Sequence, residues 1–278
     1  MDFSELAERY PVIFFDAFGV LKNASGILPG TAAVLERLRA QGKDLYIVTN
    51  DASRSPEHMA KTYVHGEHGA LVPAGKILSS GLLASEYLSE TIREGPVAYL
   101  GTEASAFFIE HAGLRALPVS ECREQDAPKA LVVLDDEGFD WPLALNRSLN
   151  LLRESDIPVV VANADLAYPV RGNEVALAAG SLGRMLESAL GRDLLFFGKP
   201  EPRMFSYVFD QAAAQHPGLQ RGDVLMVGDT LQTDILGVER FGLDTALVLS
   251  GNTPPARAEQ MIEASGIRPT HLCPSILS

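Results

Sequence analysis

The sequence predicts an α/β fold, in which a doubly wound parallel sheet forms a larger unit and a smaller α/β unit is inserted into it. Strands and helices alternate at the start of the chain, and the same pattern resumes near its end. A separate alternation occupies the middle of the chain. We therefore expect residues 1–80 and 192–278 to form the larger unit and residues 81–191 the inserted one.

The larger unit opens with a strand expected over 11–15, a helix near 30–41 and a strand over 44–48. These strands are short apolar runs bounded by turn residues, which is typical of strands buried in a parallel sheet. Ser55 followed by Pro56 is a typical helix start, with a capping side chain before a proline. The loop over 49–54 is therefore short and lies between a strand and a helix.

The inserted unit has its own alternation, with strands expected over 97–100, 130–134 and 158–161 and helices over 103–111, 142–153 and 181–190. The first pattern then returns with a strand expected over 194–197, a helix near 202–214, a strand over 224–227, a helix over 231–240 and a strand over 245–249. We expect the run over 194–197 to belong with the larger unit, because the inserted alternation ends before it.

Composition excludes several classes of partner. The net charge of −13 argues against nucleic acid and anionic membranes, because the sequence offers no basic stripe to neutralise a row of phosphates. The first residues lack the features of a signal peptide, and no apolar run reaches transmembrane length. We therefore expect a cytoplasmic protein whose partner is a small molecule.

Four apolar runs end in residues suited to phosphoryl chemistry. They are followed by Asp16, by Thr49-Asn50, by Gly198-Lys199 and by Gly228-Asp229. In open α/β sheets the ligand lies beyond the carboxyl ends of the strands. The four run ends are therefore predicted to meet in one crevice.

The residue types at these ends fit attack on a phosphate ester. Asp16 is placed to act as a nucleophile that forms an aspartyl-phosphate. The Thr49 hydroxyl, the loop amides around Asn50 and the Lys199 ammonium would hold the phosphate oxygens.

Two carboxylates at the run ends also predict a magnesium site. Mg²⁺ needs few carboxylates because it keeps several water ligands, so Asp16, Asp229 and a backbone carbonyl between them suffice. Asp234 follows five residues after Asp229 and brings a further carboxylate to the same strand end.

The run ends together resemble one known family. The matching stretches are 14–21, Val48-Thr49-Asn50, 197–200, 227–230 and Thr233-Asp234-Ile235, with Asn163-Ala164-Asp165 and Gly180-Ser181-Leu182 in the insertion. They resemble the haloacid dehalogenase superfamily, in its class IIA branch of inserted-cap phosphatases (the sugar-phosphatase or nitrophenyl-phosphatase-like group). The resemblance implies a Rossmann-like core with an α/β cap.

The same resemblance implies roles for individual residues. Asp16 would be the nucleophile, and Thr49 and Lys199 would contact the phosphate. Mg²⁺ would be held by Asp16, the Phe18 carbonyl and Asp229, with Asp234 supporting it. The substrate would be a small phosphorylated metabolite, and relatives often pair through their caps, so a homodimer through the cap is expected.

Phe18 departs from the family pattern. Phosphatases of this family carry a second aspartate there, which acts as general acid and base, whereas phenylalanine has no proton to donate. A positioned acid or base contributes on the order of 10² to 10⁴ in rate, so a slow phosphatase is expected, especially with alkyl phosphates. The alternative is a scaffold that only binds a phosphorylated ligand.

Asp51 and Asp165 are the remaining candidates near the substrate. Asp51 is either a substitute acid or a turn carboxylate that accepts hydrogen bonds from its own loop, and the turn interpretation is favoured. Asp165 and the carboxylates over 135–140 follow strands of the insertion, where they would bind substrate hydroxyls or an amine.

Overall fold

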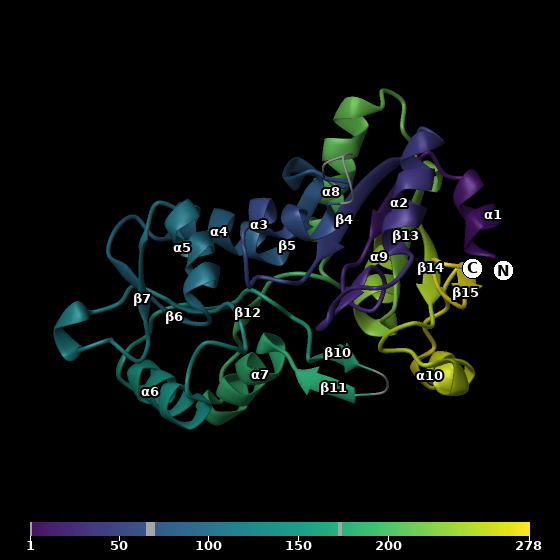
Figure 1. The fold of residues 1–278 in the computed structure, drawn as a ribbon. Coiled ribbons are helices and arrows are strands. Elements are labelled where there is room, and N and C mark those ends of the chain that lie inside the picture. The colour runs from purple at the N-terminus through teal and green to yellow at the C-terminus, as the bar shows by residue number, and fades with distance from the viewer. Residues whose placement is uncertain (1, 65–69, 172–173) are drawn as a thin grey trace.

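The computed structural model describes residues 2–64, 70–171 and 174–278. It consists of two α/β units side by side, each built on its own parallel sheet (Figure 1). The two sheets are called the core sheet and the cap sheet below. The predicted α/β fold with a doubly wound core and an inserted α/β cap is confirmed.

The core sheet has six parallel strands in the order β15-β14-β13-β1-β4-β5. Their bounds are β1 Val12–Phe15, β4 Asp44–Thr49, β5 Ile77–Ser79, β13 Val224–Gly228, β14 Asp244–Val248 and β15 His271–Cys273. β1 lies between β13 and β4, with Phe15 beside Val227 and Ile47. The carboxyl ends of these three strands therefore lie together at one edge.

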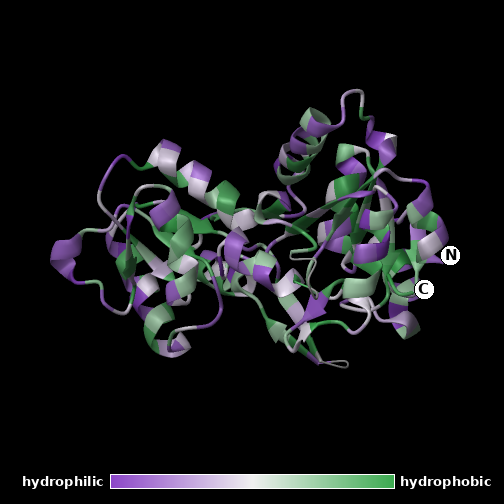
Figure 2. Ribbon diagram, turned by 45° about the horizontal axis from the view of Figure 1, so that its top comes forward, coloured by the Kyte–Doolittle hydropathy of each residue, from purple (hydrophilic) through white to green (hydrophobic). Residues whose placement is uncertain are grey.

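Helices cover both faces of the core sheet. The helices of the core are α1 Phe3–Glu8, α2 Thr31–Ala40, α3 Pro56–Ala60, α8 Pro202–Gln215, α9 Leu236–Phe241 and α10 Ala258–Ser265. Ile13 and Phe15 pack with residues of α1, α2 and α3, whereas Phe14 packs with residues of α8 and α9. Alternate residues of the buried strand β1 thus face opposite helix layers. Hydrophobic residues are concentrated on the strands of the sheet (Figure 2).

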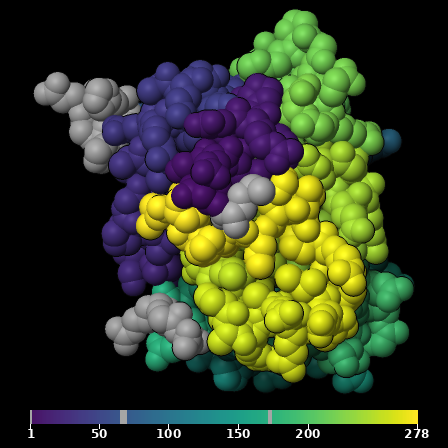
Figure 3. Space-filling view, turned by 90° about the vertical axis from the view of Figure 1, so that its right-hand side faces the viewer, coloured from purple at the N-terminus to yellow at the C-terminus, as the bar shows by residue number. Residues whose placement is uncertain are grey.

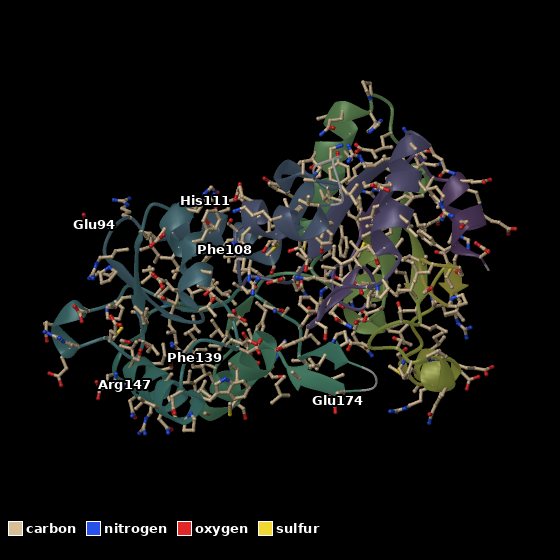
Figure 4. All side chains as sticks on the ribbon, viewed as in Figure 1. Glu94, Phe108, His111, Phe139, Arg147 and Glu174 are labelled. Atoms are coloured by element: carbon tan, nitrogen blue, oxygen red, sulfur yellow. The ribbon has the colours of Figure 1, made fainter. Side chains whose placement is uncertain are left out.

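The cap sheet has five parallel strands in the order β12-β9-β8-β6-β7. Their bounds are β6 Pro96–Leu100, β7 Arg115–Pro118, β8 Leu131–Val133, β9 Val159–Val161 and β12 Leu195–Phe196. α4 Ser80–Thr91 and α5 Phe107–His111 cover one face, and α6 Trp141–Glu154 and α7 Ala179–Leu190 cover the other. In Figure 4 Phe108 of α5 lies inside this unit, whereas Glu94 and Arg147 lie at its outer edge.

The expected strand over 194–197 was assigned to the wrong sheet. The structure reduces it to β12, which pairs with β9 at the edge of the cap sheet. Phe196 packs against the cap cluster together with Leu194, and the Phe197 amide donates to the Val161 carbonyl. The apolar run is therefore the last strand of the cap, and Lys199 follows a cap strand rather than a core strand.

Two small hairpins lie where the units meet. β2 Lys22–Asn23 pairs with β3 Gly26–Ile27 just after β1, and β10 Ala167–Arg171 pairs with β11 Glu174–Leu177 in the cap. The cap hairpin extends toward the core (Figure 1), and Tyr168 of β10 contacts Phe18. Neither hairpin was predicted, because the short mixed segments lack a long alternating pattern.

Short helical turns complete the fold. They lie at Lys61–Tyr63, Ala74–Lys76, Glu103–Ala106, Glu124–Asp126, Arg221–Asp223 and Pro255–Arg257, and a π-helix lies at Leu231–Ile235. The helix expected over 231–240 thus begins as a π-helix and continues as α9. No helix within the described ranges has the length and apolar character needed to cross a membrane.

The two chain ends lie side by side on the core (Figure 3). The amides of Phe3 and Ser4 donate to the Oγ and the carbonyl of Ser278, both at 3.2 Å. The first helix therefore closes over the end of the chain on the face that α2 and α3 also cover.

Candidate active site

Asp16 lies at the carboxyl end of β1, in the centre of the core sheet. Its amide donates to the Val227 carbonyl of β13 at 2.8 Å, which continues the strand pairing by one residue. The side chain turns into the crevice and is only 8% exposed. Burial raises the pKa of this carboxyl well above its ordinary value, although the Lys199 charge opposes the shift.

Lys199 is a fully buried cation between two carboxylates. Its Nζ lies 2.5 Å from Asp16 Oδ1 and 2.7 Å from Asp234 Oδ1, and the residue is 1% exposed. Burial alone would lower the pKa of this ammonium, but the charges of Asp16 and Asp234 outweigh burial and raise it. Lys199 is therefore charged and fixes the direction of the Asp16 carboxylate.

Asp229 follows β13 and is held by the loop after β14. Its Oδ2 accepts the Asn252 amide at 2.7 Å, its Oδ1 accepts the Thr230 hydroxyl at 2.7 Å, and its carbonyl accepts the Thr253 hydroxyl at 2.6 Å. Sequence reasoning missed Asn252 and Thr253. The rule used for the other run ends would have found them, because Ser250-Gly251-Asn252-Thr253 follows the predicted strand over 245–249.

Asp16, Asp229 and Asp234 fit a divalent cation. One carboxyl oxygen of each residue lies within 4.8 Å of the other two, and all three residues are buried. Asp234 Oδ2 accepts the amides of Asp229 and Thr230, both at 3.1 Å, and its Oδ1 accepts from Lys199. Asp234 is thus engaged by other groups, which suits the supporting role expected for it.

The pKa of Asp229 is consistent with a site that binds a cation. Burial and, to a smaller extent, the nearby Asp234 charge together raise the pKa of the Asp229 carboxyl to about 7. Three buried carboxyls face one lysine, so the cluster carries an excess of negative charge when it ionises. A hard cation with oxygen ligands would neutralise this excess.

Substitution of Gly251 should disturb the site through Asp229. A Cβ at this position would lie 1.8 Å from Asp229 Oδ2 and 2.7 Å from the Gly19 Cα. We expect Gly251→Ala to lower the free energy of unfolding by about 1–3 kcal/mol and to weaken binding of a divalent cation at the carboxylate cluster, because the Asp229 carboxylate must move. Gly75→Ala is the control, since a Cβ there meets nothing within 4 Å. Urea unfolding and metal titration measure the two effects. If Gly251→Ala and Gly75→Ala changed stability and metal affinity by the same amounts, this explanation would be wrong.

Asn50 joins the core to the loop that carries Lys199. Its Oδ1 accepts the Lys199 amide at 2.7 Å, and its Nδ2 donates to the Lys199 carbonyl at 3.0 Å and to Asp165 Oδ1 at 2.9 Å. Gly198 allows this contact, because a Cβ there would lie 2.3 Å from Asn50 Oδ1. Asn50 thus sets the position of Lys199, although no core strand precedes that lysine.

Phe18 lies in the turn after β1 and faces the cap hairpin. Its ring is in edge contact with the Tyr168 ring, with 5.6 Å between centroids, and the Lys22 Nζ lies 4.2 Å from the centre of the Phe18 ring. The position where the family is expected to carry an acid is therefore occupied by an aromatic contact between core and cap.

Asp51 is engaged by its own loop and by a lysine. Its Oδ1 accepts from the Ser53 amide at 2.9 Å and the Ser53 hydroxyl at 2.6 Å, and its Oδ2 accepts from Lys22 at 3.1 Å. Burial would raise its pKa, but the Lys22 charge and the Ser53 hydrogen bonds lower it. The structure supports the turn interpretation, since an ionised carboxylate has no proton to give.

A cavity of about 510 Å³ lies between core and cap in front of Asp16. Its lining residues are Asp16, Phe18, Ala24, Thr49, Asp51, Ser53, Arg54, His58, Thr102, Ala104, Asp135, Asp136, Glu137, Asn163, Asp165, Tyr168 and Ala178. Burial raises the pKa of Asp135 to about 7 and that of Asp136 to about 6, with charge repulsion adding to the first shift. The cap wall of the cavity is therefore acidic.

The raised pKa of Asp135 predicts that Asp135→Asn increases the stability of the folded protein in a pH-dependent way. An acid whose pKa is higher in the folded chain loses stability as pH rises from its unfolded pKa, about 3.9, to its folded pKa, about 7. We expect the asparagine variant to melt at a higher temperature than the native protein at pH 8. At pH 4 the two melting temperatures should agree, and a gain of equal size at both pH values would contradict the explanation.

The structure brings all of the predicted site residues together. Asp16, Phe18, Thr49, Asp51 and Asp165 line the cavity. Hydrogen bonds connect them to the remaining predicted residues, which are Asn50, Lys199, Asp229 and Asp234. Tyr168 and Lys22 were not predicted. The roles of these residues in binding and catalysis stay predictions.

The chain is similar to proteins of one family along nearly its full length. Residues 13–115 match the family described as haloacid dehalogenase-like hydrolase, and residues 196–278 match the HAD-hydrolase-like family. Chronophin from Bos taurus is 31% identical over 267 residues, which cover 94% of this chain and 88% of chronophin. The chain therefore belongs to the haloacid dehalogenase-like hydrolases.

Two solved structures have the same fold. A possible sugar phosphatase of the HAD superfamily from Cytophaga hutchinsonii is 48% identical with a TM-score of 0.92, covering 100% of this chain and 98% of that one. The glycerol phosphate phosphatase from Mycobacterium tuberculosis, in complex with magnesium, is 26% identical with a TM-score of 0.76, covering 98% and 76%. Among the hydrolases of its family the chain is a phosphoric monoester hydrolase.

Proposed function

We propose that this protein is a Mg²⁺-dependent phosphatase that hydrolyses a small phosphorylated metabolite, such as a sugar phosphate, through an aspartyl-phosphate at Asp16. The observation that carries the proposal is the buried lysine that joins two carboxylates beside a third, where one of the joined carboxylates, Asp16, lines a cavity that admits a small molecule. The relative from Mycobacterium tuberculosis, solved with magnesium, supports the choice of metal.

Different residues of the site orient the nucleophile, contact the phosphoryl group and hold the metal. Lys199 and Asn50 orient the Asp16 carboxylate, and the Thr49 hydroxyl lines the cavity where the phosphoryl group would lie. Asp16, Asp229 and the Phe18 carbonyl would hold Mg²⁺, and Asp234 would support Asp229 from its own loop. Mg²⁺ would neutralise phosphate charge as it develops in the transition state.

The proposed substrate preference follows from the cavity. Phe18 supplies no acid, so hydrolysis of alkyl phosphates depends on a proton donor elsewhere in the cavity, and without one it should be slower than in relatives that carry an aspartate at this position. The acidic cap wall, with Asp135, Asp136 and Asp165, favours an organic group that donates hydrogen bonds, such as a polyol or an amine.

A panel of phosphate esters tests the proposed function. Phosphate release is measured for aryl, acyl, sugar and other alkyl phosphates, with Mg²⁺ and after removal of the metal by a chelator. We expect release that falls at least tenfold on metal removal and returns when Mg²⁺ is restored. If the protein bound phosphate or a metal-fluoride mimic tightly but released phosphate from none of the esters, the binding-protein alternative would replace the proposal.

A further inference from the structure

We propose that Asp165 of the cap is the general acid and base of this site, in the place of the carboxylate that position 18 lacks. The inference rests on the proposed phosphatase function and adds a catalytic residue to it. Asp165 lines the same cavity as Asp16 and Thr49, but it reaches that cavity from the cap rather than from the turn after β1.

The backbone of Asp165 is fixed in place. Its amide donates to Asn163 Oδ1 at 2.9 Å, and its carbonyl accepts the Gly180 amide of α7 at 3.1 Å. Gly180 makes this approach possible, because a Cβ there would lie 2.4 Å from the Asp165 carbonyl oxygen. The turn that carries Asp165 is thus clamped between the end of β9 and the start of α7.

One oxygen of the Asp165 carboxyl accepts a hydrogen bond from the loop after β4. Asp165 Oδ1 accepts from Asn50 Nδ2 at 2.9 Å, and Asn50 is the residue that also holds Lys199. Along the described ranges, Oδ2 makes no hydrogen bond to protein, which leaves that oxygen available to a substrate. Asp16 and Asp165 line the same cavity, so a substrate bound there can meet both carboxyls.

The other carboxyls of the cavity suit the role less well. Asp51 is ion-paired with Lys22 and has a lowered pKa, so it stays ionised. Asp136 accepts from the Tyr168 hydroxyl at 3.3 Å, and Asp135 accepts from the Asp136 amide. Glu137 also lines the cavity but is exposed. Among the described contacts, none of these three cap carboxyls has a hydrogen bond to the Thr49–Asn50 loop or to Lys199, whereas Asp165 is bonded to Asn50.

The protonation of Asp165 suits a proton exchange near neutral pH. Burial raises its pKa to about 6, although Lys199 and the Asn50 hydrogen bond oppose the shift. A pKa near the working pH allows one group to give a proton in one step and accept it in the next.

The two steps balance in atoms and charge. Asp16 attacks phosphorus, the bond between phosphorus and the ester oxygen breaks, and that oxygen takes the proton of Asp165 to leave as an alcohol. Ionised Asp165 then takes a proton from water, whose oxygen bonds to phosphorus. The bond from phosphorus to Asp16 breaks, which releases phosphate and restores both carboxyls to their starting states.

The decisive test is the kinetics of Asp165→Asn with two esters, 4-nitrophenyl phosphate and glycerol phosphate. With the aryl ester we expect a burst of nitrophenol at nearly the native rate, then steady turnover slowed by about 10²-fold, because the first step needs no acid and the second needs a base. With glycerol phosphate the first turnover should itself slow by about 10²-fold. Glu94→Gln, exposed at the outer edge of the cap, is the matched control and should keep native rates.

A double variant distinguishes the loss of an acid from a local folding defect at Asp165. Phe18→Asp introduced into Asp165→Asn should recover turnover of glycerol phosphate at least tenfold, because it restores an acid from the core side. The proposal is overturned if Asp165→Asn stays within threefold of native kcat with both esters, if only KM rises, or if Phe18→Asp recovers nothing. Absence of Mg²⁺-dependent turnover in the native protein would instead remove the proposed function itself.

Discussion

Asp16→Asn is expected to reduce phosphate release at least about 10³-fold with every ester, because the amide cannot attack phosphorus. The native protein should form an acid-stable phosphoryl adduct on rapid quenching, and the variant should form none. Mass spectrometry of the quenched protein, followed by peptide mapping to Asp16, measures this directly. The effect should be the same for aryl and alkyl esters, which separates it from loss of an acid.

The variant should remain folded. Lys199 keeps its 2.7 Å contact with Asp234, and the amide oxygen at position 16 can still accept from Lys199. Burial and the charges of Asp234 and Asp229 raise the pKa of Asp16. Replacing the carboxyl by an amide therefore removes its repulsion with these two residues. Circular dichroism and a melting temperature close to native serve as controls. Residual release within tenfold of native would show that another group attacks phosphorus.

The core of the fold could be predicted because its strands carry a strong pattern. β1, β4 and β13 are buried apolar runs that end at turn residues, and the predicted Ser55 cap is confirmed by its 3.2 Å hydrogen bond from the His58 amide. β5 and β15 were missed, because three residues between helical turns and loops give too little periodicity to recognise.

The site could be predicted as a set of residues but not as a geometry. The rule on strand ends placed Asp16, Thr49 and Asp229 correctly, since each ends or follows a core strand. It placed Lys199 near them for the wrong reason, because its position depends on side-chain hydrogen bonds from Asn50 across the chain. Contacts between residues so distant in sequence leave no local pattern to read.

The partners of Phe18 and Asp51 could not be predicted for the same reason. Tyr168 meets Phe18 only because the cap hairpin extends to the core, and Lys22 meets Asp51 only because the β2–β3 hairpin folds back over the loop. The contact with Lys22 affects protonation, since the Lys22 charge lowers the pKa of Asp51. The choice between the two interpretations of Asp51 therefore needed the tertiary structure.

Lys199→Met is expected to have the largest effect on stability. The substitution leaves Asp16, Asp229 and Asp234 buried without their cation, and breaking a buried ion pair from one side costs about 3–5 kcal/mol. The methionine chain fills much the same space, so the loss should arise from charge rather than from a cavity. Urea unfolding measures it, and Lys61→Met, at an exposed lysine, is the control that should change stability little.

The dependence of this loss on pH and Mg²⁺ identifies its cause. Without Lys199 the pKa of Asp16 should rise further, so the folded chain loses stability as pH rises above the unfolded pKa of about 3.9. The difference in unfolding free energy between variant and native protein should therefore be larger at pH 8 than at pH 5. Added Mg²⁺ should recover part of it, because the cation replaces the missing charge beside the carboxylates. A loss that is the same at both pH values and insensitive to Mg²⁺ would mean that packing, not charge, makes Lys199 necessary.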